Sequence, residues 1–321
     1  MKSKVAIVIV TYNSEEQIEA CLTSVFAQRR SVTQQVIVVD NKSRDGTVAL
    51  VRNRFPEVEL VLPGENLGFA KGVNLGVNHS NAEYVLLLNP DTVILENAVD
   101  VLVEFAGKQP CHGLYGGRTL KPDGSLEPSS CWGAPTLWSM ALFAFGITTL
   151  APRNRWLVPE SLGGWQRDSV REVGVVTGCF LLASSAVWRE LGGLDECYFM
   201  YGEDVDLALR ARALGYRPVI CPDAKLIHEV GRSSESPVHK TMLLYRGKAS
   251  LVRRHWKGGP RALGLFLLMA GTGLRATVSS LASLSRPPEA AGRWQTLWSR
   301  RDEWLKGYPG LDDRPASSEL R

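Results

Sequence analysis

The chain has 321 residues, which is long enough to bury a sizeable core and a little above the usual size of one domain. Hydrophobic residues make up 45% of it and charged residues 22%, and this ordinary balance excludes a disordered chain and a multi-span membrane protein. The net charge of +4 is mild and argues against nucleic-acid binding. We therefore expect one large globular domain with an appendage.

The six cysteines and the first residues indicate the compartment. No two cysteines form a Cys-x-x-Cys pair, so the sequence indicates neither a zinc site nor a disulfide framework, and we expect reduced thiols. The apolar run that starts at Val5 is ended by Thr11, Tyr12 and Asn13, too early for the apolar region of a signal peptide. Both observations predict a cytosolic protein.

Residues 1–115 alternate between strand patterns and helix patterns. Residues 5–10 are continuously apolar and rich in β-branched side chains, as expected of a strand buried on both faces of a parallel sheet. Asn13 and Glu16 then have the spacing of a capping box at the start of a helix. Further strands are expected at 36–39, 58–62 and 84–88, and helices around 48–51, 68–79 and 99–106. This alternation predicts an α/β fold with a doubly wound, mostly parallel, Rossmann-like sheet.

Residues 116–239 are expected to complete the same domain, which thus covers 1–239. An insertion or lid is predicted at 120–170, and its apolar stretch 136–150 is too short to span a bilayer, which needs about 20 residues. Regular elements return as strands 173–176, 179–183 and 218–221 and helices 185–191 and 203–214.

Residues 240–321 form a helical region with a basic amphipathic pattern. The apolar run 262–274 and several late tryptophans follow this pattern. Two interpretations stay open, packing of these helices on the preceding α/β domain and docking on an anionic membrane face. Because Arg275 interrupts the apolar run, we expect peripheral association rather than a membrane span.

Polar residues follow three of the predicted strands. Ligands of doubly wound sheets bind at the carboxyl ends of strands, and this rule singles out residues 11–13, 40–41 and 89–91. At that edge the Asp91 carboxylate could hold Mg²⁺ or Mn²⁺ against a diphosphate, because these cations prefer oxygen ligands. The alternative is an ordinary Asn-Pro-Asp turn.

Three carboxylates, Glu203, Asp204 and Asp206, start a predicted helix. Acidic residues there can simply favour the helix N-terminus, and we prefer this interpretation for Asp206. Asp204 could instead act as a general base toward a hydroxyl group.

Taken together, five segments resemble the family 2 glycosyltransferases, and within them the bacterial rhamnosyltransferase-like branch. They occur in the family's order over most of the first 230 residues: 8–13, 38–41 with Ser43 and 45–47, 65–70 with Asn74, 88–91, and 202–207. The resemblance implies the GT-A fold, with 1–115 as the nucleotide-sugar-binding half and 116–239 as the acceptor-binding half.

The resemblance also implies roles for single residues. Asp91 and His228 would hold Mg²⁺ or Mn²⁺, with Asn89 in place of the first Asp of the family's DxD motif, and Asp204 would be the catalytic base. The nucleotide sugar would be bound by Thr11, Tyr12, Asn13, Asp40, Asn41, Asn66, Gly68, Phe69, Ala70, Asn74, Asn89, Glu203 and Arg232.

The implied activity is inverting transfer of a sugar from a nucleotide-diphosphate donor to a saccharide or lipid-linked saccharide acceptor in cell-envelope polysaccharide synthesis. The resemblance favours L-rhamnose from dTDP-rhamnose. It places the enzyme in the cytoplasm, peripherally on the cytosolic face of the inner membrane, with no nucleic-acid partner and an open oligomeric state.

Two alternatives remain, a UDP-sugar-dependent glycosyltransferase and a non-catalytic nucleotide-sugar-binding homologue in a membrane complex. A glycosidase would not need the nucleotide motifs. A dinucleotide oxidoreductase would show Gly-x-Gly-x-x-Gly after the first strand, where this chain has no glycine.

Overall fold

The computed structural model describes residues 3–28, 32–150, 152, 154–229, 236–283 and 292–310. The chain forms two compact units. The first contains Met1–Trp132, Trp165–Phe199 and Asp204–Ser234, and the second contains Gly133–Gly164, Met200–Glu203 and Glu235–Arg321. The expected domain division at residue 239, and the halves within it, stay predictions.

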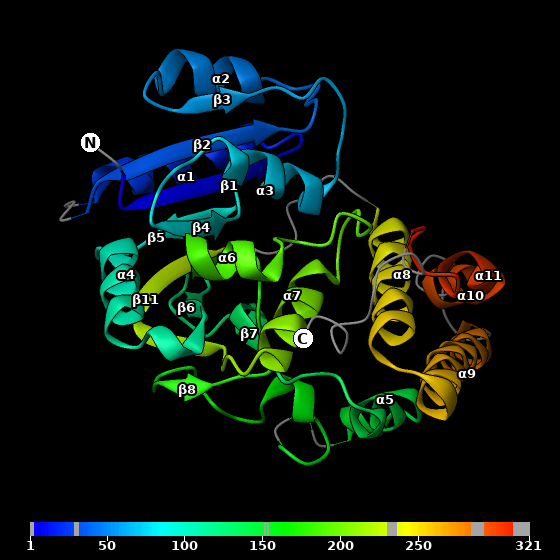
Figure 1. Ribbon diagram of the computed structural model, residues 1–321. Coiled ribbons are helices and arrows are strands. Elements are labelled where there is room, and N and C mark those ends of the chain that lie inside the picture. The colour runs from blue at the N-terminus through cyan, green and yellow to red at the C-terminus, as the bar shows by residue number, and fades with distance from the viewer. Residues whose placement is uncertain are drawn as a thin grey trace. The chain divides into compact units, whose positions relative to one another are not determined.

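The first unit is built on a large mixed sheet, which has nine strands in the described part of the chain (Figure 1). Its strands are β1 (Val5–Thr11), β2 (Gln34–Asp40), β3 (Glu59–Val61), β4 (Tyr84–Leu88), β5 (Thr92–Ile94), β6 (Leu114–Leu120), β8 (Arg171–Glu172), β10 (Phe180–Ser184) and β11 (Val219–His228). They follow the order β3-β2-β1-β4-β10-β6-β11-β5, and β8 pairs with β11 outside this path. β10, β5 and β8 run antiparallel to their neighbours, while the other strands share one direction.

Helices cover both faces of this sheet. In the first unit they are α1 (Glu15–Ala27), α2 (Thr47–Arg54), α3 (Phe69–Asn78), α4 (Ala98–Lys108), α6 (Ser185–Leu191), nearly all of α7 (Glu203–Ala213) and the 3-10 turns η1 (Pro110–His112) and η2 (Pro128–Ser130). Ile7 of β1 lies in one core cluster with Leu22 of α1 and Val99 of α4, whereas Val8 lies beneath α3 on the other face. Successive strand residues point to opposite faces, so a strand covered on both sides must be apolar throughout, as β1 is. The α/β class predicted from the sequence is confirmed.

Two local predictions need correction. Asn13 does not cap α1, because its N-cap is Ser14, while the Asn13 side chain accepts a hydrogen bond from Arg44 N at 2.8 Å. The central strand β6 was missed because two glycines dilute its apolar pattern. The second of them, Gly117, lies so close to the neighbouring strand that a Cβ there would be 2.3 Å from the Ala224 carbonyl oxygen.

Residues 120–170, where an insertion is predicted, contribute to both units. In the first unit, β7 (Cys131–Trp132) and β9 (Val175–Val176) form a small antiparallel sheet. The second unit contains α5 (Leu137–Ala144), η3 (Ile147–Thr149), η4 (Pro159–Ser161), α8 (Pro237–His255), α9 (Gly258–Ser283), α10 (Gly292–Ser299) and α11 (Arg301–Trp304).

The second unit is a helical body with its own core. Trp304 is fully buried, packs edge to face on Tyr245 at 5.1 Å between ring centroids and donates to Leu297 O at 2.8 Å. Arg275 of α9 donates to Phe143 O of α5 at 2.6 Å. Among the described residues, Gly258–Leu281 is the one helical segment long and apolar enough to cross a membrane by length and composition, and 33% of its most apolar window is buried.

Candidate active site

The carboxyl ends of β1, β2, β4 and β11 lie at the same edge of the sheet, because these strands share one direction. Thr11 ends β1, Asp40 ends β2, Asn89 follows β4 and His228 ends β11. Four of the candidate residues thus reach one edge from segments far apart in the sequence.

Asp40 is buried and held by three hydrogen bonds. Thr11 Oγ1 donates to Asp40 Oδ2 at 2.9 Å, and Ser43 donates through its backbone N to Oδ1 at 2.8 Å and through its hydroxyl to Oδ2 at 2.5 Å. These donors hold the carboxyl group in one orientation. Tyr12, which follows Thr11 at the end of β1, exposes 38% of its surface.

The loop 66–70 is joined to the same edge by Asn41. The buried Asn41 side chain donates from Nδ2 to Gly68 O at 3.0 Å, and Asn66 Oδ1 accepts from Gly68 N at 3.0 Å. Phe69 N donates to Phe199 O at 2.8 Å. The backbone of this loop is therefore fixed from both sides.

Ala70 and Asn74 have structural contacts in this loop and the helix behind it. Ala70 is fully buried. Asn74 donates to Leu194 O at 2.8 Å and to Glu196 Oε1 at 3.1 Å, and accepts from Leu194 N at 3.0 Å. These contacts occupy the Asn74 amide with the loop that follows α6.

Asp91 and His228 are brought together by strand pairing. β5 pairs antiparallel with β11 in a register that places Thr92 opposite His228, and Glu229 N donates to Asp91 O at 3.0 Å. His228 Nε2 then lies 3.3 Å from Asp91 Oδ1. This carboxylate oxygen is buried and has no hydrogen-bond partner among the described residues.

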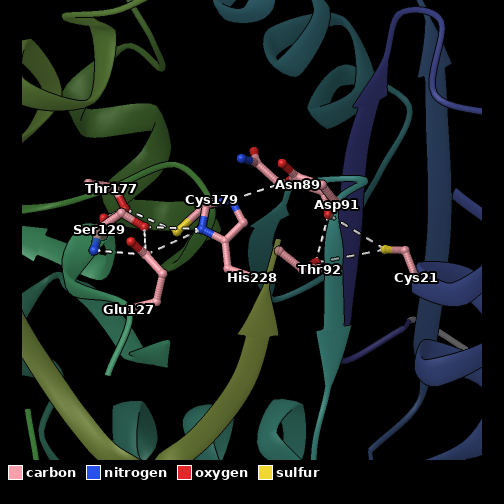
Figure 2. A network of polar contacts seen from close by, with 9 residues as sticks. All are labelled: Cys21, Asn89, Asp91, Thr92, Glu127, Ser129, Thr177, Cys179 and His228. Atoms are coloured by element: carbon pink, nitrogen blue, oxygen red, sulfur yellow. Dashed lines mark hydrogen bonds and ion pairs between the residues drawn. The ribbon is translucent and has the colours of Figure 1, made fainter. Parts of the chain in front are cut away.

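The opposite ring nitrogen of His228 faces Glu127 and Ser129, which sequence reasoning missed. Figure 2 shows His228 between these two residues and Asp91. Nδ1 lies 3.0 Å from Ser129 Oγ and 3.7 Å from Glu127 Oε2. Burial would lower the pKa of His228, but the contacts with Asp91 and Glu127 raise it to about 9. Burial likewise opposes ionisation of Glu127, but the nearby His228 ring and hydrogen bonds from Ser129 hold the pKa of Glu127 below the ordinary value.

Asp204 lies near the start of α7, where Val205 N donates to its Oδ1 at 2.8 Å. Burial raises the pKa of this carboxyl, and hydrogen bonds from the backbone N–H groups of Val205 and Gly178 offset part of the rise. Asp206 makes a buried ion pair with Arg210 Nε at 2.7 Å, and its favourable effect at the helix N-terminus stays a prediction.

The segment around Cys179 connects Asp204 to the Asp91 region. Gly178 N–H donates to Asp204, and Cys179 O accepts from Asn89 N at 3.1 Å. Burial raises the pKa of the Cys179 thiol to about 12, and the negative charges of Asp91, Glu127 and Asp204 add to this rise. Asp91, Glu127 and Asp204 therefore lie within electrostatic range of one sulfur atom in the first unit.

Two candidate residues are not part of this cluster. Glu203 starts α7 but groups with the second unit. Arg232 lies outside the described residues.

Comparison with known proteins identifies the family. Residues 6–185 match the model of "Glycosyl transferase family 2". The chain is 32% identical over 305 residues to an N-acetylglucosaminyl-diphospho-decaprenol L-rhamnosyltransferase of Mycobacterium tuberculosis, covering 89% of this chain and 96% of that protein. It is 27% identical to the low-salt glycan biosynthesis hexosyltransferase Agl10 of Haloferax volcanii over 71% of this chain and 68% of that protein. The fold and the edge of carboxylates define a glycosyltransferase, and the chain belongs to glycosyl transferase family 2.

Solved structures support the GT-A fold. The mannosyltransferase PcManGT from Pyrobaculum calidifontis, in complex with GDP-Man and Mn²⁺, matches with a TM-score of 0.54 at 18% identity, over 95% of this chain and 86% of that chain. S. aureus TarS 1-349 in complex with UDP matches with a TM-score of 0.51 at 18% identity, over 95% of this chain and 83% of that chain.

Proposed function

We propose that the protein transfers L-rhamnose from dTDP-L-rhamnose, with inversion, to a lipid-linked saccharide of the N-acetylglucosaminyl-diphospho-polyprenol class during cell-envelope polysaccharide synthesis. The observation that carries this proposal is the 32% identity to the mycobacterial L-rhamnosyltransferase over nearly the full length of both chains. The fixed Asp40, the Asp91 and His228 pair and Asp204 supply matching chemistry.

The carboxyl edge of the first unit would bind the donor. Asp40 and Tyr12 would contact the ribose and base, with Thr11 and Asn13 shaping the same edge and Asn41 holding the 66–70 loop against the sugar nucleotide. A carboxylate whose rotamer is already fixed loses little conformational entropy when it binds a ribose hydroxyl.

The Asp91 and His228 pair fits a divalent cation. Asp91 Oδ1 is a buried oxygen without a hydrogen-bond partner in the described part of the chain, and His228 Nε2 is close enough to share a ligand with it. Oxygen atoms of the donor diphosphate and of water would complete the coordination around this pair, because Mg²⁺ and Mn²⁺ prefer oxygen ligands. Bound there, Mg²⁺ or Mn²⁺ would neutralise the charge that develops on the diphosphate.

Asp204 would act as the base. Its carboxylate takes the proton of the acceptor hydroxyl while that oxygen forms a bond to the anomeric carbon and the bond from this carbon to the diphosphate oxygen breaks. The electron pair leaves with the diphosphate, so no covalent sugar intermediate on the protein is needed. The raised pKa of Asp204 makes it a stronger base than an exposed aspartate.

The test is release of nucleoside diphosphate from a panel of nucleotide sugars with Mg²⁺ or Mn²⁺, with and without N-acetylglucosaminyl-diphospho-polyprenol. We expect turnover of dTDP-L-rhamnose and its loss in Asp91→Ala and in Asp204→Asn. Turnover of a UDP-sugar alone would refute the rhamnosyl assignment. Nucleotide binding without turnover of any donor, even with acceptor, would favour a non-catalytic homologue.

We further propose that the second unit docks peripherally on an anionic membrane, where a polyprenol-linked acceptor would reside. One face of α9 carries exposed apolar side chains at helical spacing: Leu263, Phe266, Leu274, Val278 and Leu281. Lys257 and Arg261 at the start of the helix suit anionic headgroups. Other residues of the same helix, Leu267, Leu268 and Arg275, pack inside the unit, so the helix is suited to lie on the bilayer rather than to cross it.

Vesicle flotation of the full chain tests this docking. We expect flotation with phosphatidylglycerol vesicles, weaker flotation with phosphatidylcholine, and loss of flotation in the double variant Phe266→Glu/Val278→Glu. Leu62→Glu is the matched control, since Leu62 is 48% exposed but lies in the first unit. A chain that never floats would refute membrane docking and leave the transferase assignment untouched.

A further inference from the structure

Glu127 is a buried carboxylate at the candidate metal pair to which neither the sequence motifs nor the comparisons assign a role. A tight turn after β6 returns the chain along this strand, with Lys121 N donating to Ser125 O at 2.8 Å. Glu127 N then donates to Thr119 O at 3.1 Å, and Thr119 Oγ1 donates to Glu127 O at 2.5 Å. The residue is therefore fixed to the end of β6, the strand that pairs with β11 and so lies next to His228.

Hydrogen-bond donors and acceptors around His228 can be assigned from this arrangement. The Ser129 hydroxyl has one proton, and it donates that proton to Glu127 Oε2, which also accepts from Ser129 N at 2.9 Å. The lone pair of the hydroxyl is then the group that faces His228 Nδ1 at 3.0 Å, so Nδ1 is the nitrogen that carries hydrogen. In the neutral imidazole the lone pair must lie on Nε2, which faces Asp91.

We propose that Glu127, through Ser129, is a positioning residue that fixes His228 in the tautomer whose Nε2 can bind a divalent cation together with Asp91. Metal-binding histidines commonly donate their second ring nitrogen to a carboxylate or a hydrogen-bonded group, which sets the ring orientation and increases ligand basicity. Thr177 Oγ1 donates to Ser129 O at 2.7 Å and so helps to fix Ser129 between Glu127 and His228 (Figure 2). This inference rests on the metal pair of the proposed function.

The simpler role for Glu127 is to cap η2, because its side chain accepts from Ser129 N. The two roles differ in what Glu127→Gln does. Glutamine keeps an amide oxygen that can accept from Ser129 N, so a cap would survive. The same substitution removes the negative charge and adds a donor, so the hydrogen bonds that link His228 Nδ1 through Ser129 Oγ to residue 127 would be disturbed.

The experiment measures Mn²⁺ binding to the full chain by electron paramagnetic resonance, together with ¹⁵N resonances of the histidine rings. We expect Glu127→Gln to weaken Mn²⁺ binding by roughly 10- to 100-fold and to shift the His228 ring resonances, with an unchanged melting temperature. Ser129→Ala is expected to act in the same direction. Glu160→Gln is the matched control, because Glu160 Oε1 also accepts from a serine hydroxyl, Ser139 Oγ at 2.5 Å, but lies in the second unit.

The outcomes separate this inference from the metal pair itself. If His228→Ala loses Mn²⁺ binding while Glu127→Gln binds within about twofold of the native chain, well below the expected effect of an outer-shell partner, the positioning role is refuted and the metal pair stands. If His228→Ala and Asp91→Ala both bind Mn²⁺ as the native chain does, the metal pair is refuted and the role of Glu127 with it.

Discussion

Replacement of Gly68 by alanine should damage the loop that we assign to the sugar nucleotide. Gly68 has φ +78° and ψ −178°, a backbone region that is essentially restricted to glycine. A Cβ there would also lie 2.4 Å from the carbonyl oxygen of Phe199. That oxygen cannot move away freely, because it accepts the hydrogen bond from Phe69 N.

The expected cost follows from these two terms. Backbone strain of this kind costs about 1–3 kcal/mol. Relief of the contact would break the hydrogen bond from Phe69 to Phe199, which contributes about 1 kcal/mol net. We therefore expect a destabilisation of about 2–4 kcal/mol, or a melting temperature lowered by about 5–10 °C. Scanning calorimetry is the suitable assay, because it can resolve separate transitions of two units.

Gly64→Ala is the control, since Gly64 has φ +83° but nothing within 4 Å of an added Cβ. Gly64→Ala should be destabilised only by the backbone strain of a positive φ, which costs about 1–2 kcal/mol. Gly68→Ala should also raise KM for the donor, whereas Gly64→Ala should not. Equal melting temperatures for the two variants would refute the contact with Phe199, and an unchanged KM in Gly68→Ala would count against the loop as part of the donor site.

Three further predictions concern single side chains. Asp206→Ala should destabilise the protein by about 3–5 kcal/mol, because it leaves the Arg210 charge buried without its carboxylate; calorimetry measures this, and an unchanged stability would contradict it. The value of kcat/KM should fall as the pH falls through the pKa of Asp204, because this carboxylate must be ionised to act as the base. Burial raises this pKa above the ordinary value of an aspartate. A profile that stays flat down to the ordinary aspartate range would show that Asp204 is not the base. Trp304→Ala should cost about 3–5 kcal/mol in the transition of the second unit, since this side chain is fully buried and also bonds Leu297; a variant as stable as the native chain would refute the core described for that unit.

Local patterns in the sequence determined the elements whose signal is complete within a few residues. β4 (Tyr84–Leu88) and α6 (Ser185–Leu191) begin and end where their patterns predict, because each is a short, uninterrupted run of suitable residues. β11 is longer than predicted, since Pro222 and Asp223 interrupt its pattern while pairing continues beyond a register shift.

The edge at which the candidate site lies was also predictable. Once the chain reads as alternating strands and helices, the residues after each strand must meet at the carboxyl edge of the sheet, and this places Thr11, Asp40 and Asp91 together. The family resemblance then favoured the base role among the two open for Asp204, and it supplied a metal-binding role for His228 that no spacing in the sequence could give.

Only the tertiary structure decided what surrounds His228. Its contact with Asp91 depends on the antiparallel register of β5 and β11, and its contact with Ser129 depends on the turn that carries Glu127 back along β6. A lone glutamate next to a proline has no periodicity and resembles any surface turn, so its burial beside a histidine is set by the packing of distant strands. The sequence alone therefore determined the type of sheet and the edge where ligands bind, whereas the pairing of ionisable groups across that edge depended on long-range register, which local propensity does not encode.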